Sequence, residues 1–205
     1  MTYAFDMIDT NQLLSIAFTL VSNFTNVVEI PPDHVPTRRE ELKEFVVGSP
    51  VSPLDIYMVH RLGDEFWLRH GVVQQYQSPE SFHHKDLRTM LTKYLGTPTL
   101  STNEVVEHAT HIMRKLSKTG LSVDMIAPKI EAAWSPDVHF FEISWPVTNS
   151  PFHNGLGSIE IDARTGRVVF VQLWGKEFYD FAAAAEISKR VYKPDPPPRP
   201  PRIPR

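Results

Sequence analysis

Nine histidines are the side chains of this 205-residue chain that could bind a metal or carry protons. His108 and His111 stand three residues apart on an expected helix, and His83 and His84 are adjacent. A zinc site needs three or four converging ligands, and the chain has no His-Glu-x-x-His pattern. His111 falls opposite the apolar stripe of its helix, which is typical of a solvated face. We therefore predict neither a metal nor a cofactor.

Two other histidines, His60 and His70, lie on stretches that favour strands and could approach each other across them. We interpret them as ordinary strand residues, because many side-chain types pair across strands. Adjacent carboxylates, which could serve acid–base catalysis, occur at Asp64-Glu65 and Glu40-Glu41. A turn explains the first pair and a solvated helix start the second, since acidic residues are favourable near a helix N-terminus.

Nucleophiles and phosphate cradles are also missing. Ser150, Ser158 and Thr165 stand in no Gly-x-Ser-x-Gly sequence. The loop His153–Gly157 holds a single Gly-x-Gly, without the third glycine and the strand-to-helix context of a phosphate site. The chain has no cysteine, which excludes thiol catalysis, zinc-thiolate sites and disulfides. The sequence therefore predicts no catalytic residues, and it leaves the binding residues unknown.

The charge balance limits the class of partner. The formal net charge is −3, from 21 basic and 24 acidic residues. The segment from Lys193 onward carries four basic residues and one acidic residue, so the rest of the chain is near −6. An acidic body argues against binding nucleic acid through phosphate contacts. No stretch reaches the roughly 20 apolar residues of a membrane span.

The apolar run Leu13–Val21 does not have the flanks of a signal peptide, because Asp6 and Asp9 precede it and no Lys or Arg does. Two interpretations stay open: the protein stays in the cytoplasm, or a leader was removed before Met1. The absence of cysteine is compatible with both compartments.

The stretch Ile159–Leu173 predicts a β-hairpin at the centre of a sheet. Its first strand, Ile159–Asp162, alternates apolar and acidic residues, so we expect one buried and one wet face. Its second strand, Val168–Val171, is apolar on both faces and needs cover on each. Gly166 can supply the positive φ that a tight reversal with a bulge requires. Two short side chains can hydrogen-bond the turn backbone, Asp162 and Thr165.

Apolar residues at helical spacing predict two long amphipathic helices. The first follows N-cap candidates at residues 9–11, and its stripe consists of Leu13, Ile16, Ala17, Leu20, Val21 and Phe24. The second starts at Ser101 and ends at Gly120, and its stripe consists of Val105, Val106, Ala109, Ile112, Met113 and Leu116. Weaker patterns predict helices from Thr37 to about Val46, from Ser78 to Gly96 and over Phe178–Val191.

Runs of β-forming residues predict further strands. Two of them, Ile56–Leu62 and Glu65–Gln75, are joined by a two-residue turn at Gly63-Asp64. The others are Lys129–Trp134 and Val138–Trp145. A helix followed by strands therefore occurs twice, which suggests a repeat. The predicted fold class is α+β, with antiparallel sheets, helices packed on one face and two similar halves.

We predict three regions: an N-terminal α+β half over residues 1–96, a second α+β half over 97–192, and a Pro-rich tail over 193–205. The tail holds 7 of the 18 prolines and has too little apolar surface to fold. Its P-x-x-P spacing is that of polyproline ligands, but we interpret the tail as a solvated spacer, because proline-rich termini can serve as plain extended spacers.

The second half resembles a PepSY-type module, a small cystatin-like α+β unit. The residues that carry the resemblance lie within about 100–175 and are the helix Asn103–Leu116, the strand Phe140–Trp145 and the ending Ile159–Val168. Within that ending, residues 161–168 match the family pattern V-D-A-x-T-G-x-V, with Ile161 in place of the first Val. The insert Thr148–Gly157 departs from the compact form of the family.

Such modules are similar to propeptide and protease-regulating domains of bacterial exported proteins, and they are non-catalytic. The resemblance therefore implies an interaction module with a protein partner, no catalytic residues and an extracytoplasmic setting. The leading hypothesis is a non-enzymatic interaction or regulatory module that binds a protein or a peptidase.

Two alternatives stay open. One is a metal-dependent hydrolase, which would have to bring at least three of the scattered His, Asp and Glu residues together in a pocket. The other is a small-ligand carrier with a cavity lined by Trp and Phe. The tryptophans are expected in the core or as sheet cover, whereas an exposed cluster would mark a binding face; they are Trp67, Trp134, Trp145 and Trp174.

Overall fold

The computed structural model of the chain describes residues 9–47, 55–81, 99–117, 121–132, 140–146 and 155–191. Outside these residues lie the Pro-rich tail, most of the helix predicted from Ser78 to Gly96 and the boundary predicted at residue 96. The same holds for several residues considered above, namely His83, His84, Trp134, Ser150 and His153. What the sequence predicts for them stays a prediction.

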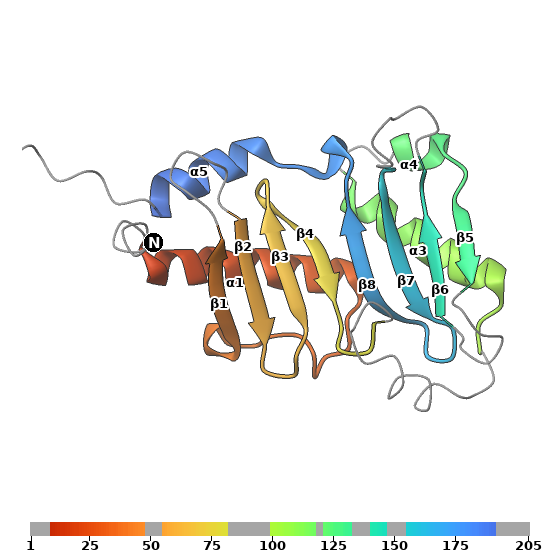
Figure 1. Ribbon diagram of the computed structural model, residues 1–205, viewed down its shortest axis with the longest axis horizontal. Helices are drawn as coiled ribbons and strands as arrows, with labels where there is room; N and C mark the ends of the chain where they lie inside the picture. The colour runs from red at the N-terminus through yellow and green to blue at the C-terminus, as the bar shows by residue number, and fades with distance from the viewer. Residues whose placement is uncertain are drawn as a thin grey trace, which may run out of the picture.

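Helices and strands follow one another in two runs along the chain (Figure 1). The first run consists of α1 (Thr10–Val28), the 3-10 turn η2 (Arg39–Glu41), β1 (Leu42–Val47), β2 (Asp55–His60), β3 (Glu65–Arg69) and β4 (Val72–Gln77). The second consists of α3 (Thr102–Leu116), α4 (Leu121–Met125), β5 (Lys129–Ala132), β6 (Phe140–Ser144), β7 (Gly157–Asp162) and β8 (Arg167–Leu173). The chain then continues through η3 (Lys176–Phe178) to α5 (Phe181–Val191).

The strands of the described residues form one antiparallel sheet in the order β1-β2-β3-β4-β8-β7-β6-β5. The helices α1 and α3 cross the same face of this sheet, behind the strands in Figure 1. The first half has one helix, α1, and the second has two, α3 and α4, each set followed by four strands, and the halves meet where β4 pairs with β8. The predicted α+β class with an antiparallel sheet is confirmed, and the helix-then-strand pattern recurs in the structure.

α1 begins at the cap that its sequence predicts. Asp9 is the N-cap, and its carboxylate accepts a hydrogen bond from the Gln12 backbone N–H at 3.0 Å. At the other end Glu29 adopts a left-handed φ of 59°, and its N–H bonds to the Thr25 carbonyl. The core face of the helix is buried along its whole length through Leu13, Ala17, Val21, Phe24 and Val28.

α3 starts with a capping box, as its sequence predicts. The Glu104 carboxylate accepts a hydrogen bond from the Ser101 backbone N–H at 2.7 Å, and the Ser101 hydroxyl accepts one from the Glu104 N–H. The buried face consists of Val105, Ala109, Ile112 and Met113. The helix ends at Leu116 rather than at the predicted Gly120, because the extended backbone of Ser117, with ψ of 136°, leads the chain out of it.

The predicted hairpin exists, as β7 and β8, and it lies at the centre of the sheet. Gly166 has a φ of 72° and donates its N–H to the Asp162 carbonyl at 2.8 Å. The register shifts between Glu160 and Ile161, two residue pairs away from the turn, where β8 carries one extra residue and forms a bulge. Val168–Val171 is buried on both faces, as its composition predicts.

One prediction for the hairpin is wrong, because β7 does not leave a face in water. All of its residues are buried, including Ser158 at 1 %, Glu160 at 3 % and Asp162 at 2 % exposure. The buried Ser81 hydroxyl donates to Glu160 Oε2 at 3.1 Å, and the Arg164 guanidinium forms a bidentate pair with Asp162. Protein donors thus replace water at the carboxylates of Glu160 and Asp162. The alternation of apolar and acidic residues in the sequence does not show whether water or protein surrounds the acidic face.

The short helix predicted from Thr37 to Val46 is also wrong. The Glu41 carboxylate accepts hydrogen bonds from the Thr37 backbone N–H at 2.7 Å and hydroxyl at 3.2 Å, which closes the single turn η2. From Leu42, with ψ of 129°, the backbone is extended and pairs with β2 along the whole of β1. Sheet pairing of a segment that ends in two valines overrides the local capping signal.

The single strand predicted over Glu65–Gln75 is two strands, β3 and β4. They are joined by a tight turn at His70-Gly71, where φ is 53° and 77°, the two positive values of a type I′ hairpin. The β2–β3 connection also differs, because residues 61–64 separate the strands instead of Gly63-Asp64 alone. Histidine is not among the residues that dominate turns, so the pair His70-Gly71 is a weaker turn signal than Asn-Gly or Asp-Gly.

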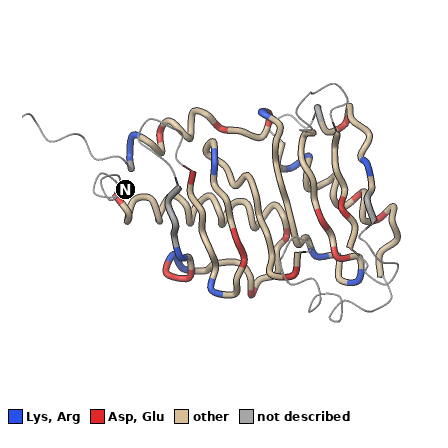
Figure 2. The backbone as a smooth tube through the Cα atoms, viewed as in Figure 1, with Lys and Arg blue, Asp and Glu red and all other residues tan. Residues whose placement is uncertain are grey.

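Charged residues are spread over the described part of the chain. Figure 2 shows Lys and Arg at separate places in both halves, interspersed with Asp and Glu. No helix among the described residues is long and apolar enough to cross a lipid bilayer.

Replacing Gly166 with valine tests the central turn. A φ of 72° is strained for a β-branched side chain, so Gly166→Val should lower the free energy of unfolding by about 1–3 kcal/mol. Urea denaturation followed by tryptophan fluorescence measures this change. Gly166→Asn is the matched control and should lose less, because asparagine tolerates the left-handed region. An unchanged melting temperature of the valine variant would contradict the turn.

Candidate functional site

The described histidines do not gather into a metal site. His111 is exposed on α3, and His108 is half-buried there. His60 ends β2 whereas His70 lies in the β3–β4 turn, so these two are at opposite ends of β3 and do not meet. Among the residues that the structure describes, no group of three or more His, Cys, Asp or Glu side chains could hold a metal ion.

The carboxylates considered above serve local structure. The Thr37 backbone N–H bonds to Glu41 and holds the pKa of that carboxyl below its usual range. Asp162 accepts a hydrogen bond from the Arg164 backbone N–H at 3.0 Å in addition to those from its guanidinium. Asp162 therefore braces the β7–β8 turn, as the sequence predicts.

Asp64 organises a buried polar cluster with His34, His60 and Tyr76. Its side chain is fully buried. One carboxylate oxygen accepts a hydrogen bond from the Tyr76 hydroxyl at 2.9 Å. The other lies 2.8 Å from His34 Nδ1 and 3.4 Å from His60 Nδ1. The cluster joins the loop after α1 to the β2–β3 connection and to β4.

This cluster fastens the fold, and of its members only His34, at 14 % side-chain exposure, reaches solvent. A buried carboxylate is stable when neighbouring donors satisfy its oxygens, and three side chains surround Asp64 for that purpose. Burial, followed by the Asp64 charge, raises the pKa of Tyr76 well above its usual value, so the phenol stays a donor. None of the four residues lines the grooves described below.

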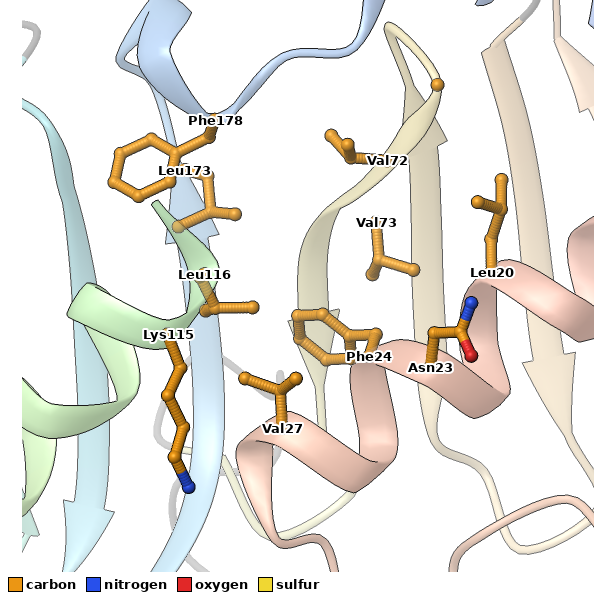
Figure 3. A pocket seen from close by; sticks show the side chains of 11 residues that line it. Leu20, Asn23, Phe24, Val27, Val72, Val73, Lys115, Leu116, Leu173 and Phe178 are labelled. Carbon is orange, nitrogen blue, oxygen red and sulfur yellow. The ribbon is translucent and has the colours of Figure 1, made fainter. Parts of the chain in front are cut away.

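A groove of about 190 Å³ lies between α1 and α3, directly over the seam where β4 pairs with β8 (Figure 3). Its described lining is aliphatic and aromatic. The floor comes from the two seam strands, the walls from the two helices and one end from η3, through Val73, Leu173, Phe24, Val27, Leu116 and Phe178. The groove therefore belongs to neither half alone.

Two polar side chains stand at the rim of this groove, Asn23 of α1 and Lys115 of α3. Lys115 Nζ lies 3.3 Å from Glu29 Oε1, and both side chains are exposed. Such a pair contributes little to stability, because water and salt screen it. Lys115 is the single ionisable residue of the described lining, so the groove offers binding surface rather than paired acid and base groups.

A second groove of about 350 Å³ runs between α1 and α5, and Leu20 lines both grooves. The α1 residues that line the two grooves recur every three or four positions and form a second stripe beside the core stripe: Gln12, Ser15, Ile16, Thr19, Leu20, Asn23 and Val27. We call the two grooves, together with the α1 stripe that lines them, the α1 trough. From Gln12 to Val27 it follows about 22 Å of helix.

The segment Trp174–Val191, which we call the strap, fixes one wall of the trough. The Asp180 backbone N–H donates to the His70 carbonyl at 2.8 Å, and a Cβ at Gly71 would collide with the Asp180 carbonyl. The Tyr179 ring lies 4.4 Å from the His70 ring, centroid to centroid. The strap thereby seats η3 and α5 on the β3–β4 turn of the other half.

The described tryptophans do not form a cavity. Trp145 is fully buried and Trp174 half-buried, whereas Trp67 is 39 % exposed on the face of the sheet away from the helices. The groove at the seam contains Phe24 and Phe178, and no tryptophan is among its described lining residues. The tryptophan-lined cavity of the carrier hypothesis is therefore not found in the described part of the chain.

We compared the chain with known proteins, and the result makes the geometry described above the basis for the proposed function. The chain matches no protein-family model, no curated protein and no solved structure.

Asp64 and His60 stand out in the sequence, whereas their partners His34 and Tyr76 do not. His34 is 30 positions from Asp64 and Tyr76 is 12 positions away, so no local pattern links them. The α1 trough does not stand out either, because half of its stripe is polar and reads as a solvated helix face.

Removing the Asp64 carboxylate tests the buried cluster. Asp64→Ala should lower the free energy of unfolding by about 3 kcal/mol, because it leaves buried donors without an acceptor. The matched control is Asp33→Ala, since the Asp33 side chain is 74 % exposed and lies 3.8 Å from the same His34. The control should change stability by less than about 0.5 kcal/mol. Equal losses for the two variants would show that Asp64 is not the organising residue.

The pH dependence of stability tests the contact between the strap and the β3–β4 turn at His70. Burial, followed by the Arg69 charge, lowers the pKa of His70 below 6.5, against a smaller opposing effect of Asp55. The neutral ring is favoured in the folded protein, so its contribution to stability is present above pH 6.5 and is lost as the pH falls through the lower folded pKa. NMR titration of His70 measures that pKa directly.

The control for this titration is His70→Asn, because asparagine tolerates the φ of 53° at this position. The variant should lose the part of the stability–pH profile that His70 contributes. A pKa of His70 at or above 6.5 in the folded protein would show that folding does not favour the neutral ring.

Proposed function

We propose that the protein is a non-enzymatic interaction module that binds an amphipathic helix of a partner protein in the α1 trough. The observation that carries the proposal is the trough itself, whose two grooves share Leu20 and run along one stripe of α1. At the seam the described lining is apolar, with a polar rim of Asn23 and Lys115. An apolar centre with a polar rim is typical of protein interaction surfaces.

The length of the trough favours a helix over a small molecule. About 22 Å corresponds to four helical turns, and a helix docks in a groove through apolar residues spaced by three or four positions. The groove at the seam has about 190 Å³, below the 300–1,000 Å³ of common ligand pockets, whereas the second groove, of about 350 Å³, lies within that range, so the length of the trough carries the argument. The space at the seam suits a few apolar side chains of a partner.

Charges at the rim favour a partner with polar residues of both signs. Lys115 pairs with Glu29 at 3.3 Å, and Arg190 pairs with Glu186 at 2.9 Å beside the second groove. These exposed ion pairs can open and bind charged groups of a partner at low free-energy cost, because each contributes little to the stability of the fold. A helix with both acidic and basic residues flanking its apolar stripe would complement the two ends of the trough.

The resemblance to PepSY-type modules supports the same proposal and adds its setting. The residues that carry the resemblance form α3, β6 and the β7–β8 hairpin, and α3 supplies Leu116 and Lys115 to the trough. The proposal therefore includes a regulatory role towards a protein or a peptidase, and a bacterial, exported protein. The single sheet, which joins the two halves through β4 and β8, gives such a module one continuous helix face for binding.

Selection from a library of displayed 16-residue peptides tests the trough with the full-length protein. We expect selected peptides to carry apolar residues at helical spacing and to lose at least about tenfold in affinity, 1.4 kcal/mol, when Leu20 is replaced by glutamate. Leu20 also packs against the core, so Asn23→Glu at the exposed rim is a second variant that should weaken binding without loss of fold. Fluorescence anisotropy measures the affinities.

The matched control is Ile130→Glu, which places the same charge on an exposed apolar residue of the edge strand β5. It should leave peptide affinity unchanged. Peptides without apolar periodicity, or peptides that bind Leu20→Glu and Asn23→Glu as tightly as the unaltered protein, would overturn the proposal.

A further inference from the structure

The face of the sheet away from α1 and α3 differs between the two halves. In the second half it is covered, since Glu160 and Phe170 are 3 % and 4 % exposed. In the first half it is open: Trp67 is 39 % exposed, and Tyr57 and Gln75 are partly exposed. The first half therefore presents an aromatic sheet surface to solvent, on the side opposite the α1 trough.

Tyr57 and Trp67 form the centre of this open face. They are cross-strand partners on β2 and β3, and their ring centroids lie 4.5 Å apart with the ring planes tilted by 46°. Trp67 is in turn opposite Gln75 on β4, which is opposite Gln172 on β8. Two aromatic rings and two amide side chains therefore follow one another across four neighbouring strands.

This sequence of side chains matches the chemistry of a polyproline segment. Such a segment presents flat apolar rings and backbone carbonyls that have no partner within their own helix. Aromatic-lined surfaces bind the rings, and amide N–H groups can donate to the carbonyls. Tilted aromatic rings on adjacent strands leave an angled surface on which a proline ring can lie.

The open face carries charges of both signs, because Lys43 on β1 is exposed there and is the cross-strand partner of Val59. Glu65 lies next to Tyr57, and burial followed by the hydrogen bond with Glu65 raises the pKa of Tyr57 to about 12. The Asp55 carboxylate on the same face is paired with Arg69. Residues 193–205 contain Lys193, Arg199, Arg202 and Arg205 against Asp195, whereas the rest of the chain is acidic.

We propose that Tyr57 and Trp67 form a proline-binding site and that its occupant is the chain's own segment Pro194–Pro201. Figure 1 shows α5 ending near the β1 edge of the sheet, which is the edge of the open half. Ten residues lead from Val191 to Pro201, and in a polyproline helix they would extend about 31 Å. Three strand spacings separate β1 from β4, about 14 Å, so the segment can pass round the edge and reach both rings.

The chain has no cysteine, so a single introduced thiol labels one position. A nitroxide on Ile203→Cys in the full-length, 15N-labelled protein should selectively reduce the amide signals of Tyr57 and Trp67. The amide of Ile143, on β6 of the other half, should keep its intensity. Trp67→Ala should abolish the selective loss.

The matched control is Ile130→Ala, which removes another exposed apolar side chain, 41 % accessible, on the opposite edge strand. It should leave the signal loss at Tyr57 unchanged. Replacing Pro197, Pro198, Pro200 and Pro201 with alanine should remove the loss while leaving the aromatic pair intact.

Three outcomes would overturn the inference. The first two are no selective signal loss at Tyr57 and Trp67, and a loss that persists in Trp67→Ala. The third is a loss in 15N-labelled protein without nitroxide when it is mixed with separate copies of the chain that carry the nitroxide but no 15N. The last outcome would assign the site to the tail of a second molecule. Because the open face lies opposite the α1 trough, these measurements and the peptide selection fail or succeed independently.

Discussion

The pairing of β4 with β8 is the interaction on which the molecule depends. It joins two helix-and-strand halves into one sheet through the register pairs Gln75–Gln172, Tyr76–Val171 and Gln77–Phe170. Two hydrogen bonds extend the seam, from Gln74 Nε2 to the Leu173 carbonyl at 2.9 Å and from the Ser78 N–H to the Val169 carbonyl at 2.8 Å. Without this pairing the floor of the α1 trough, Val73 and Leu173, would not exist.

The strap makes that seam asymmetric. It leaves the end of β8 and docks on the β3–β4 turn and α1, so a segment that belongs by sequence to the second half completes the first. The opposite sheet face shows the reverse arrangement, because Ser81 from the first half covers Glu160 of the second. Each half therefore contributes one element to the surface of the other, which locks their relative position more firmly than a short ladder alone would.

Local signals in the sequence predicted the elements that depend on local physics. The cap of α1, the capping box of α3 and the positive φ at Gly166 are each decided within a few residues. The surface that we propose for binding was not predictable in this way. Its floor pairs strands whose contacting residues are 97 positions apart, and the turn that separates β3 from β4 has His70 at its first position, where asparagine, aspartate or glycine is usual, although Gly71 follows it.

The long separation of the seam strands also affects how the protein is made. β4 leaves the ribosome almost a hundred residues before its partner β8 is complete, since Gln74 and Leu173 are 99 positions apart. Until then the nascent chain carries an unsealed strand edge, and such edges template pairing between separate molecules. Synthesis in dilute conditions or with chaperone protection should therefore decide the yield of soluble material, whereas the order of folding within each half should matter much less.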